Sequence, residues 1–174
     1  MRSPLMYNIS MYINVQNQRG LPVSPLISVL ISLRYFATGS FQIVQADLFA
    51  VSQATVSRIV SRISRAIALL RPLFIKLPTL AEIPAIQRDF YRIAAFPGVT
   101  AAIDCTHVPI ESPGGPDAEL FRNRKGYFSL NIQMACDSKL NILSLVAQWT
   151  GSVHDSRIFL NSSLCAKFEG NELL

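Results

Sequence analysis

The chain has 174 residues, of which 50% are hydrophobic and 16% charged, so its composition excludes a disordered protein and allows one ordinary domain or two small ones. Its 16 lysines and arginines outnumber the 11 acidic residues, and the net charge of +5 permits binding to a polyanion without proving it. Three cysteines without a Cys-x-x-Cys pair argue against a disulfide framework and a zinc ribbon, and no apolar stretch predicts a membrane partner.

The chain opens with a segment that lacks a hydrophobic period. Residues 1–20 are rich in Asn, Gln, Ser and Met, and we expect them to form a poorly ordered lead-in. A helical module is predicted over residues 21–78. Its first helix starts with Ser24 as the N-cap and Pro25 at the first helical position, and Gly39 ends it.

Two further helices are predicted in this module. Ser40 is expected to cap a helix over residues 41–50, and Ser52 is expected to cap a longer one from Gln53 to about Arg71, where Pro72 stops it. The apolar residues of the longer helix recur at helical intervals and predict one buried stripe: Val56, Ile59, Val60, Ile63, Ile67 and Leu70.

The second and third helices are joined by a tight connection, as in a helix-turn-helix unit. Residues 51–58 resemble the start of the recognition helix in lactose-repressor-type DNA-binding domains. The polar first turn and a basic stripe supply the candidate DNA-binding residues: Ser52, Gln53, Thr55, Arg58, Arg62 and Arg65. A solvated basic face on a structural helix is the alternative interpretation.

Residues 79–98 are predicted to form a linker and one more helix, after which the hydrophobic period becomes that of strands. Residues 99–103 predict a buried strand with a candidate continuation at residues 108–110, and residues 141–149 predict a more central strand. Residues 127–135 alternate, which predicts a half-buried strand with Phe128, Leu130, Ile132 and Met134 on one face. We therefore expect a helical module followed by a partial α/β sheet in residues 99–174, with a last helix from about Ser156.

Two aspartates follow predicted strands, and each lies near one of the two histidines: Asp104 near His107, and Asp155 near His154. A carboxylate at the end of a buried strand is costly to desolvate, and it is usually satisfied by a cation or by hydrogen bonds. We expect the two carboxylates to converge within roughly 4–7 Å at one metal site. The alternatives are a turn at Asp104 and a helix cap at residues 154–156.

Several separate blocks of residues occur in a specific order after about Ser24: Gly98-Val99, 103–107, 123–126, 129–131, Trp149, Gly151-Ser152 and 154–159. Together they resemble the core of the Harbinger transposase-derived nucleases, a family of the DDE endonuclease superfamily. The resemblance implies a ribonuclease-H-like sheet. It also implies a transposase-derived DNA endonuclease that hydrolyses phosphodiester bonds or transfers strands, with Mg²⁺ or Mn²⁺ as the cofactor.

By the same resemblance, Asp104 and Asp155 are the first and second catalytic, metal-binding acids. The third acid of the family, a glutamate farther downstream, has no counterpart, because Glu169 and Glu172 lie too close to Asp155. We interpret the sequence as truncated before that residue. The resemblance further implies DNA as the substrate, a location in the nucleus or also the cytoplasm, and a Myb-like DNA-binding partner. The alternative function is a catalytically silent DNA-binding or protein-interaction module.

The histidines and a basic loop complete the set of candidates. Magnesium sites rarely use imidazole, so His107 and His154 are expected behind the metal ligands or against a phosphate. Arg122, Arg124 and Lys125 alternate with aromatic residues, which favours contacts with nucleic-acid phosphates and bases. Histidines packed against strands and a solvated basic loop are the alternatives.

Overall fold

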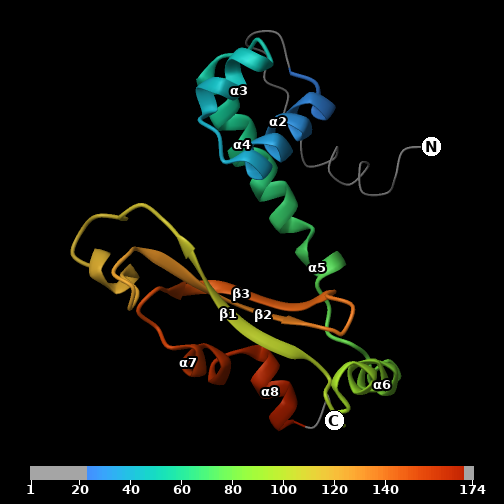
Figure 1. Ribbon diagram of the computed structural model, residues 1–174. Helices are drawn as coiled ribbons and strands as arrows, with labels where there is room; N and C mark the ends of the chain where they lie inside the picture. Colours follow the sequence, from blue (N-terminus) through green and yellow to red (C-terminus); the bar gives the residue numbers. More distant parts are fainter. Residues whose placement is uncertain (1–22, 171–174) are drawn as a thin grey trace. The chain divides into compact units, whose positions relative to one another are not determined.

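The computed structural model describes residues 23–170, which fall into two compact units divided after Phe74 (Figure 1). Residues 1–20, predicted to form a poorly ordered lead-in, lie outside the described part of the chain. No helix among residues 23–170 is long and apolar enough to cross a membrane.

The first unit is helical and consists of α2 (Pro25–Thr38), α3 (Gln42–Leu48), α4 (Gln53–Leu69) and the short α5 (Arg71–Phe74). The start of α2 is as predicted, because the Ser24 hydroxyl accepts a hydrogen bond from the backbone N–H of Ile27 at 3.3 Å. Its end is also as predicted, because Gly39 follows the helix with a left-handed φ of 59°.

The predicted cap of the second helix, Ser40, is wrong, and the predicted cap of the third helix, Ser52, is confirmed. Phe41 occupies the N-cap position of α3 without a side-chain hydrogen bond, since the Ser40 hydroxyl instead accepts from the Gln45 amide at 2.6 Å. At α4, the Ser52 hydroxyl accepts from the backbone N–H of Thr55 at 3.1 Å, so Ser52 is the cap.

The apolar stripe of α4 forms the core of the helical unit. Five of its six predicted members are buried against Ile31 of α2 and Ala46 of α3: Val56, Ile59, Val60, Ile63 and Leu70. Ile67 is the exception, with 42% of its surface exposed. It lies near the end of α4, which stops at Leu69, and Pro72 lies within α5 instead of ending the longer helix.

The second unit combines helices with a sheet, and its elements are α6 (Ile83–Ala94), β1 (Ala102–Pro109), the 3₁₀ helix η1 (Ala118–Phe121), β2 (Ser129–Cys136), β3 (Ile142–Thr150), α7 (Asp155–Leu160) and α8 (Ser163–Glu169). The described sheet is antiparallel with the order β1-β2-β3 (Figure 1). The architecture is therefore α+β, and β2 is its central strand, whereas the sequence favoured a central position for the strands on either side.

The first strand is displaced from its predicted position. It starts at Ala102 and runs to Pro109, where the sequence predicted a strand over residues 99–103. Its partner decides these bounds, since every residue from Ala102 to Pro109 pairs with β2. Asp104 consequently lies inside a strand at the edge of the described sheet instead of following a buried strand.

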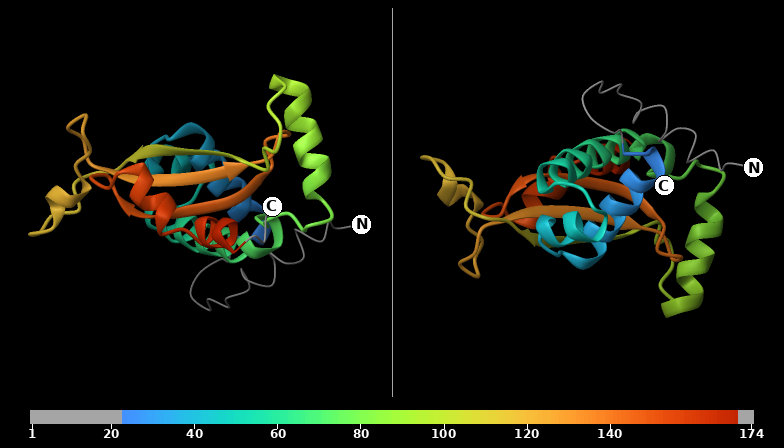
Figure 2. Two further views of the ribbon diagram at one scale, coloured as in Figure 1. Left: turned by 90° about the horizontal axis from the view of Figure 1, so that it is seen from below. Right: turned by 90° about the horizontal axis from the view of Figure 1, so that it is seen from above.

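The buried face of β2 is the polar one, which reverses the expected orientation. Ser129, Asn131 and Gln133 are almost completely buried together with Ala135, while 39% of the surface of Met134 is exposed. Figures 1 and 2 show α7 and α8 along one face of the sheet, and Leu164 of α8 packs in a core with Ala135. The helices therefore cover the polar face, whose side chains must find hydrogen-bond partners there.

Candidate functional site

Asp104 carries an exposed carboxylate. Its Oδ1 accepts a hydrogen bond of 2.8 Å from the backbone N–H of the next residue, Cys105. No basic side chain among the described residues forms an ion pair with this carboxylate. It is therefore free to meet a cation or a ligand from outside.

Asp155 is the first residue of α7, and a buried amide holds its carboxylate. The Asn131 side chain, which has no exposed surface, donates from Nδ2 to Asp155 Oδ1 at 2.8 Å and to the carbonyl of Val153 at 2.9 Å. Ser156 does not cap α7, because Nδ1 of His154 accepts from the backbone N–H of Ser156. The alternative of a helix cap at residues 154–156 is thus realised by the histidine.

Cys105 shows on which face the second carboxylate lies. The Gln133 amide donates to its sulfur at 3.9 Å. Burial is the main cause that raises the pKa of the Cys105 thiol, followed by the negative charge of Asp155 and, more weakly, that of Asp104. Asp155 thus influences this thiol more than the adjacent residue Asp104 does.

The two aspartates are assigned to opposite faces of the sheet. Successive side chains of a strand point to alternate faces, and paired residues of neighbouring strands share a face. Asp104 pairs with Met134, whereas Cys105 pairs with Gln133 on the face where Asn131 holds Asp155. One residue of register therefore separates Asp104 from the helix-covered face. The expected approach of the two carboxylates to within roughly 4–7 Å stays a prediction.

The donor atoms do not complete a metal site. Within residues 23–170, no three His, Cys, Asp or Glu side chains gather in a way that could hold a metal ion. Glu169, the nearest described acid after Asp155, accepts from the thiol of Cys165 in its own helix at 3.8 Å. Glu172 lies outside the described residues. The arrangement consequently supports no catalytic step through a metal ion.

Arg122, one of the predicted DNA-binding residues, is held within its own loop. It forms two hydrogen bonds with Glu119, at 2.7 and 2.9 Å, and a third with the carbonyl of Gly126 at 2.8 Å. The guanidinium also stacks on Phe128, 4.4 Å from the ring centre. These contacts shape the loop and leave Arg122 little capacity for a phosphate.

The two neighbouring basic residues share a pocket with both histidines. Arg124 and Lys125 are exposed and form no ion pair within the described part of the chain. A cavity of about 170 Å³ is lined by residues of three segments: His107, Asn123, Arg124, Lys125, Gly151, Ser152, Val153, His154 and Asp155. The structure therefore brings four predicted site residues together with Asp155, and not with Asp104.

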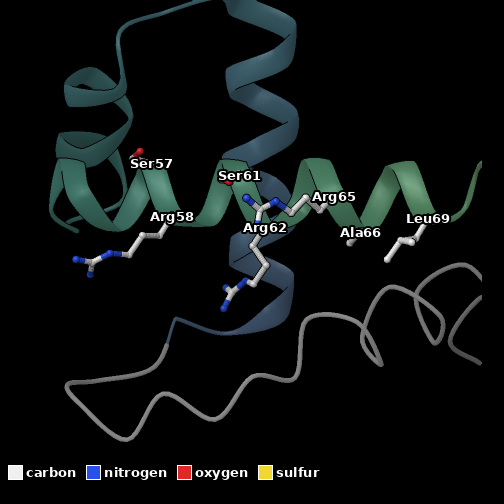
Figure 3. A pocket seen from close by; sticks show the side chains of 7 residues that line it. All are labelled: Ser57, Arg58, Ser61, Arg62, Arg65, Ala66 and Leu69. Atoms are coloured by element: carbon white, nitrogen blue, oxygen red, sulfur yellow. The ribbon is translucent and has the colours of Figure 1, made fainter. Parts of the chain in front are cut away.

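The basic stripe of α4 is present, although its three arginines differ. Figure 3 shows Arg58, Arg62 and Arg65 along one pocket on this helix, which Ser57 and Ser61 also line. Arg58 and Arg65 are exposed, whereas Arg62 is half-buried and reaches the Ser28 hydroxyl of α2 at 3.5 Å. At the start of α4, Gln53 is exposed, and the Ser52 and Thr55 hydroxyls bond to each other at 2.8 Å.

Asn131 and Gly151 are the site residues that sequence reasoning did not assign a role. The signal for Asn131 was the row of polar residues at every second position of its strand, which predicted a solvated face. Gly151 is required by space, since an added Cβ would lie 2.4 Å from the Ser129 hydroxyl and 2.5 Å from the Phe121 carbonyl. Both residues hold the loop after β3 against β2.

The sequence of the chain is similar to those of known proteins. Residues 103–174 match the family described as DDE superfamily endonuclease. HARBI1 of Homo sapiens, which is named as a candidate nuclease, is 37% identical over 153 residues, covering 87% of this chain and 44% of the relative. HARBI1 of Xenopus laevis is 31% identical over 152 residues with the same coverage. An ALP1-like protein of Arabidopsis thaliana is 27% identical over 150 residues, 86% of this chain and 36% of that protein.

The chain therefore spans less than half the length of the curated relatives it matches. No solved structure matches it.

Proposed function

Because the chain is a HARBI1-like member of the DDE superfamily of endonucleases, we propose that it supplies part of a divalent-metal-dependent DNA nuclease of transposase origin. The observation that carries this proposal is the family match over residues 103–174. This range includes most of β1, all of β2 and β3, and the helices α7 and α8. The reaction is phosphodiester cleavage or strand transfer.

The proposed cofactor is Mg²⁺ or Mn²⁺, which prefer hard oxygen ligands and stabilise charge on a reacting phosphate. Asp104 is the ligand that the chain offers most directly, since its carboxylate is exposed and without a cationic partner in the described residues. Asp155 is the second proposed acid, but its carboxylate is held on the other face by Asn131. We therefore assign the first metal contact to Asp104 alone.

The proposed organisation is a DNA-binding helix-turn-helix module in residues 21–78, followed by a linker and helix to residue 98 and a partial ribonuclease-H-like domain in residues 99–174. Support for the module comes from the short connection between α3 and α4 and from the capped start of α4. The proposed DNA contacts are Ser52, Gln53, Thr55, Arg58 and Arg65, whereas Arg62 of the predicted set is half-buried and turned to Ser28. A location in the nucleus and a Myb-like partner rest on the family resemblance alone.

Manganese binding to the whole chain tests the metal proposal. We expect electron paramagnetic resonance of Mn²⁺ to show weak binding that Asp104→Asn removes. Asp117→Asn is the matched control, because Asp117 is an exposed aspartate in the loop before η1. Binding that survives Asp104→Asn, or that Asp117→Asn removes equally, would contradict the role of Asp104.

A catalytically silent DNA-binding module is the second candidate function. It is favoured by one observation, namely that α4 presents exposed arginines while the described carboxylates do not gather. Binding of duplex DNA by a chain that binds no Mn²⁺ at Asp104 would select this function over the first.

A further inference from the structure

The pocket between β1, the loop of residues 122–127 and the loop after β3 combines basic side chains with both histidines of the chain. It lies on the face of the sheet that carries Asp155, opposite the face assigned to Asp104. The proposed metal contact therefore does not account for it. The side chains that line this pocket therefore indicate a separate ligand.

The basic loop is held rigidly. Asn123 is buried, and its Oδ1 accepts from the backbone N–H groups of Lys125 at 2.9 Å and Tyr127 at 3.4 Å. Because both of these donors belong to the backbone, the side-chain amide group that faces Ser129 is Nδ2, which donates to the Ser129 hydroxyl at 3.0 Å. The turn thus presents Arg124 and Lys125 from a fixed base.

The same hydroxyl also contacts the ring of His107. Ser129 Oγ lies 3.0 Å from Nδ1 of His107 and already accepts from Asn123. We assign the single hydroxyl proton of Ser129 to a hydrogen bond in which Nδ1 of His107 is the acceptor. With Nδ1 in contact with Ser129, Nε2 is the ring nitrogen of His107 that remains for a donor role in the pocket.

In His154, as in His107, Nδ1 is the ring nitrogen that contacts a serine. Nδ1 of His154 accepts from the backbone N–H of Ser156 at 3.3 Å as the cap of α7 and also lies 2.9 Å from the Ser156 hydroxyl. Nε2 is thus the ring nitrogen that remains for a donor role in the pocket. The backbone N–H groups of Ser152 and Val153 are used within the chain, by the carbonyls of Leu120 and Thr150. The side-chain donors that line this pocket include two cationic groups and two imidazoles.

We propose that this pocket binds one phosphodiester group of the DNA, with Arg124, Lys125 and the Nε2–H groups of His107 and His154 as donors. A phosphodiester offers oxygen acceptors and one negative charge. The two cations and the carboxylate of Asp155 leave a net charge of +1, which matches that single charge. A volume of about 170 Å³ is below that of sites for drug-sized ligands, and it suits a phosphate group rather than a whole nucleotide.

This inference rests on the proposed DNA substrate, but it needs neither a metal ion nor cleavage. The test therefore uses the whole chain with ¹⁵N-labelled histidine, in the presence of a chelator. Both histidines line the pocket, so every labelled ring reports on it. The probe is thymidylyl-thymidine, which contains one phosphodiester, and uncharged thymidine is the control ligand.

We expect both imidazole signals to shift saturably with thymidylyl-thymidine and to remain unchanged with thymidine. The double variant Arg124→Gln/Lys125→Gln should weaken the affinity about tenfold or more, because two charge-assisted hydrogen bonds are lost. Both residues are exposed, so this variant should retain its fold. Arg58→Gln/Arg65→Gln removes the same charge from the helical unit and should leave the shifts intact.

A third variant tests the role of the ring tautomer. Ser129→Ala should release Nδ1 of His107 and mix its two tautomers, which the ¹⁵N shifts of a neutral imidazole distinguish, while His154 keeps its Nε2–H form. Signals that do not move with thymidylyl-thymidine, or that move equally in Arg124→Gln/Lys125→Gln, would overturn the proposal. Such a failure would leave the manganese test at Asp104 untouched.

Discussion

Asn131 donates a hydrogen bond of 2.8 Å from its side-chain amide to the carboxylate of Asp155, 24 residues farther along the chain. This contact joins the centre of the sheet to the first residue of α7. It also fixes the carboxylate on the helix-covered face. The orientation of Asp155 is thus a property of β2 as much as of its own loop.

Replacing this amide by a carboxylate should be strongly destabilising. Asn131→Asp removes two donors and sets a buried carboxylate against Asp155 and the carbonyl of Val153, at a cost of about 3 kcal/mol or more in the free energy of unfolding. Urea denaturation measures this loss. Adding Asp155→Asn should recover part of it in a double-mutant cycle, and strictly additive effects would show that the pair does not interact.

Gly151→Ala should destabilise the second unit by about 1–3 kcal/mol, because the new methyl group would overlap the Ser129 hydroxyl and the Phe121 carbonyl. The measurement is again the free energy of unfolding. Gly115→Ala is the control, since it has no atom within 4 Å and carries only the strain of its φ of 77°. Equal losses in the two variants would mean that the close approach at Gly151 has no energetic importance.

The arginines of α4 should contribute unequally to DNA binding. Replacing Arg58 and Arg65 by Gln should lower the slope of log K against log salt by about 1.8, because each lost phosphate contact removes roughly 0.9. Arg62→Gln alone should change the slope little, as its side chain is half-buried and turned to Ser28. Fluorescence anisotropy with a labelled duplex gives these slopes, and an equal effect of Arg62 would show that it leaves Ser28 to meet the DNA.

The chain alone should not cleave DNA with Mg²⁺ or Mn²⁺. The physical reason is that a two-ion reaction needs several converging carboxylates, and none of the described acids gather in this way. A plasmid-nicking assay with the purified chain checks the expectation. Nicking that Asp104→Asn abolishes would reveal a ligand outside the arrangement of residues 23–170.

The thiol of Cys105 should react slowly with alkylating reagents at mildly alkaline pH. Burial and, second, the charge of Asp155 raise the pKa of this thiol. At a pH below the raised pKa, a smaller fraction of the thiol is present as the reactive thiolate. Asp155→Asn removes one of these causes and should increase the alkylation rate. Cys165 is the internal control, because burial and Glu169 raise its pKa independently of Asp155. Peptide mass spectrometry measures both rates, and a parallel change would indicate general loosening of the unit.

Local signals in the sequence were sufficient for most features of the helical unit, although not for the cap of α3 or the end of α4. The caps at Ser24 and Ser52, the stop at Gly39 and the apolar stripe of α4 depend on residues within one or two helical turns. These interactions have a short range in sequence, so they can be predicted without knowing the neighbouring elements. The alternation of β2 was equally visible, as was the presence of its polar row.

Only the tertiary structure decided which face of β2 is buried. A period of two residues defines two faces, but the position of α7 and α8 decides which one is covered. The same placement put Asp155 beside Asn131 and Cys105, and the pairing of β1 with β2 assigned Asp104 to the other face. In the helical unit, the packing of α4 against α2 set Arg62 against Ser28. These outcomes depend on contacts between residues far apart in the sequence. The polar row of β2 would be solvated on an open face, but burial makes its side chains part of a hydrogen-bonded network.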